Sequence, residues 1–141
     1  MEYEPRYLAG IVVFNDRDFF EAHEIWESIW LDCAGPERRF YQGLIQAAVA
    51  LYHFGNGNVR GASKLYHSSQ KYMQAYGDRY LGLDIATFWR QMECCFTEVV
   101  AAADPDKTLR PDPDLIPTIS LEPPPNSWPD PSQFLEPDQD E

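Results

Sequence analysis

Residues 19–30, FFEAHEIWESIW, contain the side chains best suited to chemistry in this chain. His23 and Glu27 are four residues apart, so on a helix an imidazole nitrogen and a carboxylate oxygen point the same way and can reach one cation. Two ligands do not make a metal site, and a third ligand would have to come from elsewhere. The candidates for that third ligand are His53, His67 and, less favoured, Glu24. With a divalent metal in place, the site would suit a metal-assisted hydrolase.

The same residues also suit a structural role. A helical wheel with about 100° per residue places His23, Glu27 and Trp30 inside an arc of apolar side chains. The apolar members of that arc are Phe19, Phe20, Ala22, Trp26, Ile29 and Leu31. An unpaired buried carboxylate costs several kcal/mol by rough estimate, so Glu27 is expected to pair with Arg39 or Arg38. A nearby arginine would repel a divalent cation, so this network competes with the metal hypothesis.

The next helical segment, residues 36–53, is apolar nearly all round except for a narrow polar stripe. That stripe consists of Arg39, Gln42, Gln46 and His53. Gly43 and Ala50 border it and leave room for either close helix packing or an organic or anionic small ligand. Taken by itself, His53 is typical of a histidine near the C-terminus of a helix, where the helix dipole favours a cation. The structural network, the small-ligand pocket and the metal site all remain open at this point.

Four segments show helical periodicity, and none of useful length alternates as a strand would. They span residues 16–31, 36–53, 59–76 and 85–103, with candidate caps at Asn15, Asn58 and Asp84. The last segment presents an apolar stripe made of Ile85, Phe88, Met92, Cys95, Phe96 and Val99. Short connections between the segments favour packing of sequence neighbours. The sequence therefore predicts an all-α fold, a compact bundle of about four main helices.

Proline and charge divide the chain into a helical domain, residues 1–103, and a Pro-rich acidic tail, residues 104–141. Ten of the twelve prolines lie in the tail, together with ten acids and two bases. Such a segment cannot bury enough apolar surface to order itself, so it is expected to be extended or disordered. The exception is DLIPTISL, residues 114–121, whose apolar residues can lie across a groove of the body.

Composition excludes some classes of partner. The formal net charge of −12 argues against nucleic acid and anionic membranes, which require clustered bases. The N-terminal residues 1–15 resemble neither a secretory signal nor a membrane span. The three cysteines, two of them adjacent, suit a reducing compartment better than a disulfide framework. A cytoplasmic protein is expected, with a small molecule or another protein as partner and with its oligomeric state open.

The quoted residues and three further blocks carry a family resemblance. FNDRDFFEAHEIWESIW, RRFYQGLIQAAVALYH, GNVRGASKL and YLGLD follow one another over roughly residues 14–83. In this order and spacing they resemble the bacterial and archaeal family known as domain of unknown function 309. The family signature, His, three residues, Glu, two residues and an aromatic, falls on His23, Glu27 and Trp30. The resemblance implies an all-helical fold and a suggested role in metal binding, and it does not extend to the acidic tail.

These observations favour a small-ligand-binding or interaction domain without a defined catalytic group. Its polar centre is predicted at the interface between the segments 16–31 and 36–53. The predicted members are His23, Glu27, Trp30, Arg39, Gln42, Gln46 and His53. The alternatives are a metal-dependent hydrolase, with His23 and Glu27 as ligands, and a structural adaptor that binds a protein partner through its surface or tail. Whether the protein is an enzyme is left open by the sequence.

Overall fold

Five α-helices dominate the computed structural model, which describes residues 2–135. They are α1 (Pro5–Asn15), α2 (Phe19–Asp32), α3 (Arg38–Gly55), α4 (Val59–Gln74) and α5 (Ile85–Ala101). Two-residue strands, β1 (Arg79–Tyr80) and β2 (Leu83–Asp84), form an antiparallel hairpin between α4 and α5. Two 3₁₀ turns, η1 (Pro113–Leu115) and η2 (Pro131–Phe134), lie in the C-terminal part. The predicted all-α bundle is confirmed, with α1 as an additional helix.

The helix α1 was not predicted because its sequence, PRYLAGIVVFN, is apolar on nearly every side and contains a central glycine and β-branched residues. It is nevertheless helical because it is buried between its neighbours. Gly10 explains the close approach to α2, since a Cβ atom there would lie only 2.0 Å from Trp26 Nε1. The predicted start of the next helix is also corrected. Asn15 ends α1, and α2 begins after Asp18, whose carboxylate accepts from the Glu21 amide at 3.3 Å.

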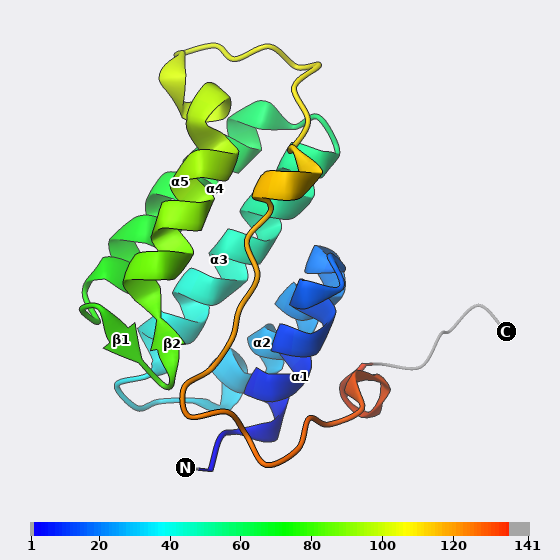
Figure 1. Ribbon diagram of the computed structural model, residues 1–141, viewed down its shortest axis with the longest axis vertical. Coiled ribbons are helices and arrows are strands. Elements are labelled where there is room, and N and C mark those ends of the chain that lie inside the picture. Colours follow the sequence, from blue (N-terminus) through cyan, green and yellow to red (C-terminus); the bar gives the residue numbers. More distant parts are fainter. Residues whose placement is uncertain (1, 136–141) are drawn as a thin grey trace, which may run out of the picture.

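Helices that are neighbours in the sequence pack against each other, with α3 in the middle between α2 and α4 (Figure 1). The helices α3 and α4 approach each other closely at Gly43, where an added Cβ would lie 2.4 Å from Met73 Cγ. There the buried Ser69 hydroxyl donates to the Gly43 carbonyl oxygen at 2.6 Å. The small residue that left room on the predicted wheel is therefore used for helix packing.

The core confirms the predicted stripe of α5 and two of the predicted caps. All six stripe residues are buried: Ile85, Phe88, Met92, Cys95, Phe96 and Val99. Asp84 accepts from the Thr87 amide at 2.9 Å, and Asn58 accepts from the Gly61 amide at 3.0 Å. None of the helices within residues 2–135 has the length and hydropathy needed to cross a membrane.

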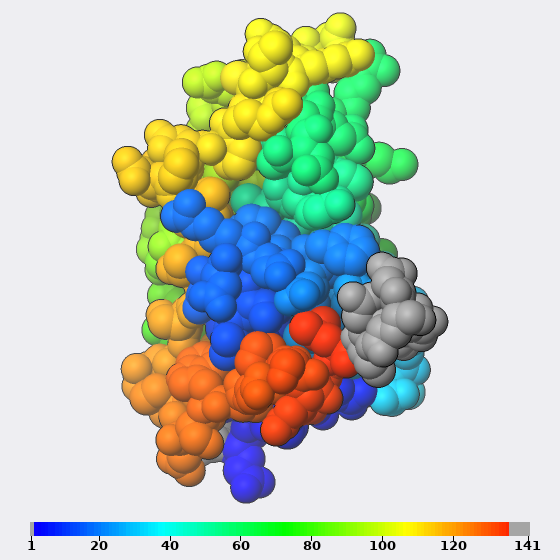
Figure 2. Space-filling model, turned by 90° about the vertical axis from the view of Figure 1, so that its right-hand side faces the viewer, coloured from blue at the N-terminus to red at the C-terminus, as the bar shows by residue number. Residues whose placement is uncertain are grey.

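The acidic tail lies on the body as far as it is described. It crosses in front of α3 between α1 and α5 and then turns under α1, where its orange and red residues lie below and beside that helix (Figures 1 and 2). Pro117, Ile119 and Leu121 are buried, as expected for apolar residues that lie in a groove. Apart from η1 and η2 the segment is extended or irregular. The domain boundary at residue 103 stays a prediction, and the part of the tail prediction that concerns residues 136–141 lies outside the described residues.

Candidate functional site

His23 and Glu27 form a pair within α2. The His23 Nε2 atom lies 3.4 Å from Glu27 Oε2, and His23 Nδ1 lies 3.0 Å from the Phe20 carbonyl oxygen. The Glu27 side chain is 51% exposed, so its carboxylate is solvated and does not require a buried partner. The expectation that this residue sits inside the apolar face is wrong.

The physical reason lies in two apolar residues that face water. Phe20 and Leu31, which widened the apparent apolar arc, are 46% and 69% exposed. The face that is buried is centred about a quarter turn away, on Ala22, Ile25, Trp26 and Ile29, with Phe19 at its side. Phe20 instead packs its ring against Tyr52 of α3 at 5.3 Å between centroids. The His23–Glu27 pair thus lies at the rim of the buried face.

The structure does not gather the third ligand that the metal hypothesis requires. Within residues 2–135, no three His, Cys, Asp or Glu residues are grouped so that they could hold a metal ion. His53 lies at the end of α3 with its Nδ1 atom 3.3 Å from Asn58 Nδ2, and His67 is exposed on α4. Glu24 lines a hollow of about 310 Å³ together with His23 and Glu27, and η2 with the residue after it closes the other side. A metal shell built from residues 2–135 alone is therefore incomplete.

Trp30, the aromatic residue of the signature, is a platform for an arginine. The guanidinium carbon of Arg38 lies 3.8 Å from the centroid of the indole ring, and Arg38 Nε donates to the Trp30 carbonyl oxygen at 3.3 Å. The indole nitrogen of Trp30 is buried without a hydrogen-bond partner in the described part of the chain. Arg38 therefore joins α3 to α2 through the tryptophan and not through Glu27.

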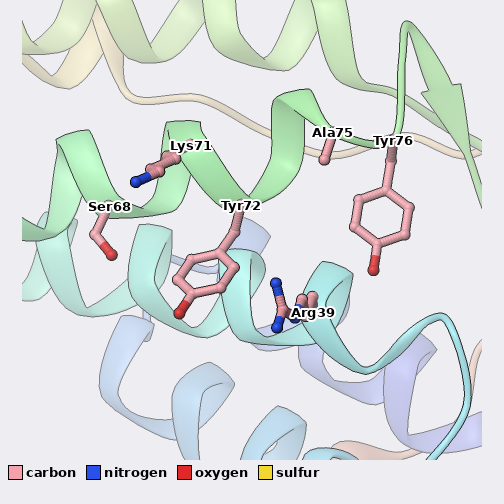
Figure 3. A pocket seen from close by; sticks show the side chains of 6 residues that line it. All are labelled: Arg39, Ser68, Lys71, Tyr72, Ala75 and Tyr76. Carbon is pink, nitrogen blue, oxygen red and sulfur yellow. The ribbon is translucent and has the colours of Figure 1, made fainter.

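Arg39 faces the opposite neighbour, α4. It lines a pocket of about 390 Å³ with Ser68, Lys71, Tyr72, Ala75 and Tyr76. Figure 3 shows the Arg39 guanidinium of α3 between the rings of Tyr72, on α4, and Tyr76, just after α4, with Lys71 and Ser68 farther along α4. The Tyr76 hydroxyl donates to the Pro36 carbonyl oxygen at 2.5 Å and is held in place by it. Two cationic groups and three hydroxyl groups line this pocket, and no acid does.

Two further residues of the predicted polar centre are Gln42 and Gln46. Gln42 and Gln46 are half-buried on α3, and Gln46 Oε1 is a buried acceptor without a partner in residues 2–135. No hydrogen bond or ion pair within that range joins either glutamine, or Arg39, to His23 or Glu27. The single polar centre predicted between α2 and α3 is thus divided. The signature pair lies on α2, and the arginine lies in a pocket toward α4.

The groups with strongly shifted pKa values lie in the core. Burial raises the pKa of Tyr7 and Tyr41, and it raises the pKa of Tyr66 and of Cys95 to about 12 each. In all four groups desolvation is the largest cause, because removal from water disfavours the charged form. These shifts reflect packing and do not identify an acid–base catalyst.

Apart from Ala75, the pocket residues that were missed in the sequence are four polar ones: Ser68, Lys71, Tyr72 and Tyr76. Their spacing of three, one and four residues puts them on one face of the 59–76 segment, which is a detectable signal. What the spacing does not reveal is that this face lies opposite Arg39. That follows from the close approach of α3 and α4 at Gly43.

Comparison with known proteins gives a family but no described activity. Residues 7–65 match the family model described as "Domain of unknown function (DUF309)". The chain is 36% identical over 101 residues to "Uncharacterized protein YpuF" of Bacillus subtilis (strain 168), covering 69% of this chain and 58% of that protein. It is 31% identical over 81 residues to an "Uncharacterized protein" of Aquifex aeolicus (strain VF5), covering 57% of this chain and 24% of that protein. The matches therefore span little more than half of one relative and about a quarter of the other.

Proposed function

Residues 7–65 match the model of the family described as domain of unknown function (DUF309), and we propose that the chain is a small-ligand-binding domain for an organic anion. The proposed site is the pocket between α3 and α4. The observation that carries the proposal is that Arg39 and Lys71 both line one pocket that no acid lines. Lys71 lies beyond the matched family segment, so the proposal concerns this chain and not the whole family.

The charges in the pocket are not neutralised by the protein itself. Neither Arg39 nor Lys71 takes part in an ion pair among residues 2–135, although the chain carries a formal net charge of −12. The end of α4 contributes about half a negative elementary charge at the same place. Two full positive charges exceed this opposing dipole. The local field therefore favours an anion within a molecule whose overall charge does not.

The chemistry of the side chains suits a carboxylate or a phosphate on an organic molecule. A guanidinium offers a planar fork of donors that matches either group, and an ammonium adds a point charge. The Ser68 and Tyr72 hydroxyls supply further donors, while Tyr76 is already committed to Pro36. The two tyrosine rings form an apolar wall beside Arg39, which suits a flat apolar group on the ligand (Figure 3). A volume of about 390 Å³ lies within the range of small-molecule sites.

The test is a titration followed by amide chemical shifts of the ¹⁵N-labelled full chain. The probes are benzoate, citrate and inorganic phosphate, with neutral benzamide as the comparison. We expect benzoate or citrate to produce saturable shifts at Arg39, Lys71 and Tyr72, and benzamide to produce none. The variants Arg39→Gln and Lys71→Gln should each weaken binding by about tenfold, the loss of one charge-assisted contact.

The matched control is Lys64→Gln, which removes an exposed base from the same helix but outside the pocket. This variant should bind benzoate or citrate with the same affinity as the unaltered protein. Arg39 is exposed, so its replacement is not expected to unfold the domain, and a circular dichroism spectrum checks this. Shifts that spread over all surface bases, or binding that is indifferent to Arg39→Gln, would contradict the proposal.

A further inference from the structure

Residues 113–123 of the tail occupy a groove between α1, α5 and the β1–β2 hairpin. Within this segment every second residue from Pro117 is buried, namely Pro117, Ile119 and Leu121, whereas Thr118 and Ser120 are exposed. This alternation is that of an extended strand with one face on a surface. The groove thus has three successive positions for apolar side chains.

The body holds the backbone of this segment as well as its side chains. The Asn15 side chain makes two hydrogen bonds to Ile119, accepting from its amide at 2.8 Å and donating to its carbonyl oxygen at 2.8 Å. Leu121 forms an antiparallel bridge with Leu83 of β2, and the Glu122 amide donates to the Gly82 carbonyl oxygen at 2.9 Å. These contacts add an isolated bridge to the edge of the two-stranded hairpin.

Contacts at both ends are also made to backbone atoms. Arg17 donates through Nη2 to the Pro113 carbonyl oxygen at 2.9 Å, and the Tyr3 hydroxyl donates to the Pro123 carbonyl oxygen at 2.6 Å. Because these groups recognise the main chain, any extended segment that fits the three apolar positions can use them. Strand addition combined with alternate side-chain pockets is a general mode of peptide recognition.

We propose that this groove is a peptide-docking site whose partner is an extended segment of another protein with the pattern Pro-x-Ile-x-Leu. The tail of the chain is its built-in occupant. The connection between α5 and η1, residues 102–112, is mostly exposed, so the segment can leave without breaking a helix. A tethered occupant acts at a high effective concentration, in the millimolar range for a short flexible linker. The tail therefore competes with the partner segment, which binds only if its concentration or its affinity for the groove is high enough to displace the tail.

The test measures binding of a fluorescein-labelled peptide of residues 113–124 to the full chain by fluorescence anisotropy. The receptor is the variant Ile119→Ser, Leu121→Ser, whose own tail no longer fills two of the apolar positions. We expect saturable binding to this variant and at least tenfold weaker binding to the unaltered chain, whose groove is occupied. Adding Asn15→Ala to the receptor should weaken binding by at least tenfold, because both backbone contacts to Ile119 are lost.

The control peptides separate the two faces of the strand. A peptide with Thr118→Ala and Ser120→Ala should bind as well as the parent, and one with Ile119→Ser should not compete. Binding that is indifferent to Asn15→Ala, or equal for both control peptides, would overturn the proposal.

If the receptor variant fails to fold, a second experiment uses the chain with its own groove and tail residues, cleaved at a protease site inserted after Asp106. Exchange of its tail fragment for labelled peptide then supports the proposal, and a fragment that never exchanges overturns it. Exchange only between whole chains, seen as dimers in gel filtration, would assign the groove to a second copy.

Discussion

The guanidinium of Arg38 lies on the indole ring of Trp30, and the same side chain donates to the Trp30 carbonyl oxygen at 3.3 Å. This contact ties the first turn of α3 to the last turn of α2, across the loop that connects them. Trp30 therefore contacts Arg38 through both its ring face and its carbonyl oxygen, and both contacts hold α2 against α3. The adjacent Arg39 points to the other side of α3 and takes no part in this contact.

Arg38→Ala should lower the free energy of unfolding by about 1–2 kcal/mol, the sum of a cation–π contact and a charged hydrogen bond. Arg38→Lys should retain part of the stability, because it keeps the charge but loses the planar fork. Arg39→Ala is the control and should stay within about 0.5 kcal/mol, as for an exposed residue. Urea unfolding measures all three, and equal losses for Arg38→Ala and Arg39→Ala would contradict a specific role for the stacking.

Gly43→Ala should destabilise the protein by about 1–3 kcal/mol, because the added methyl group would overlap the buried Met73. Gly55 in the same helix is the matched control, since a Cβ atom there meets nothing within 4 Å. Gly55→Ala should be neutral or stabilising by up to about 1 kcal/mol through the lower entropy of the unfolded chain. Thermal unfolding of the two variants decides whether helix approach, and not glycine flexibility, explains Gly43.

Glu27→Gln should change the free energy of unfolding by no more than about 0.5 kcal/mol, because the His23–Glu27 pair is one helical turn long and partly exposed. A loss of several kcal/mol would contradict this expectation and would support the buried network that the sequence predicted. Elemental analysis of the purified protein beside the His23→Ala, Glu27→Gln variant addresses the metal alternative. About one equivalent of metal in the first and none in the second would show that His23 and Glu27 bind a metal.

The cysteines should react with iodoacetamide at pH 8 in the order of their exposure. Cys94 is exposed and should be modified first, whereas burial raises the pKa of the Cys95 thiol to about 12 and leaves little thiolate. Desolvation also raises the pKa of the half-buried Cys33, so it should follow Cys94. Mass spectrometry of peptides at successive times gives the order, and early modification of Cys95 in the folded protein would contradict it. In urea the three rates should converge.

Asp84 caps α5, and hydrogen bonds from Thr87 hold the pKa of its carboxyl below the ordinary value of 3.8. A carboxyl whose pKa is lower in the folded state stabilises the fold above the unfolded pKa. That stability is lost as the pH falls through the folded pKa. Asp84→Ala should therefore reduce the urea midpoint clearly at pH 7 and less at pH 3. Asp84→Asn keeps a cap acceptor and should lose less at pH 7 than Asp84→Ala. Equal losses for alanine and asparagine would argue against the cap.

Local patterns predicted the fold better than the site. The helix α5 followed from an apolar stripe and the cap at Asp84, both of which depend on residues close in sequence. The helix α1 did not, because an evenly apolar segment with Gly10 in its middle shows no periodicity and becomes helical through packing on Trp26. Sequence alone therefore identifies helices whose stability is visible within one segment.

The site required knowledge of neighbours. A helical wheel fixes the direction of Arg39 on its own helix, but it does not say whether α2 or α4 lies in that direction. It also treated Phe20 and Leu31 as buried, and this shifted Glu27 into the apolar face. The pairing of Asn15 with Ile119 joins residues 104 positions apart, and no local pattern connects them.

That separation along the chain also orders events during biosynthesis. Helices that pack on their sequence neighbours can form as the chain emerges, since contacts of short range need little loop closure. The two hydrogen bonds of Asn15 have to wait until Ile119 has left the ribosome, after every residue of the five helices has been made. In that interval the apolar positions that later receive Ile119 and Leu121 are open to water. A nascent chain therefore exposes these apolar positions to chaperones, and to aggregation, until Ile119 and Leu121 reach them.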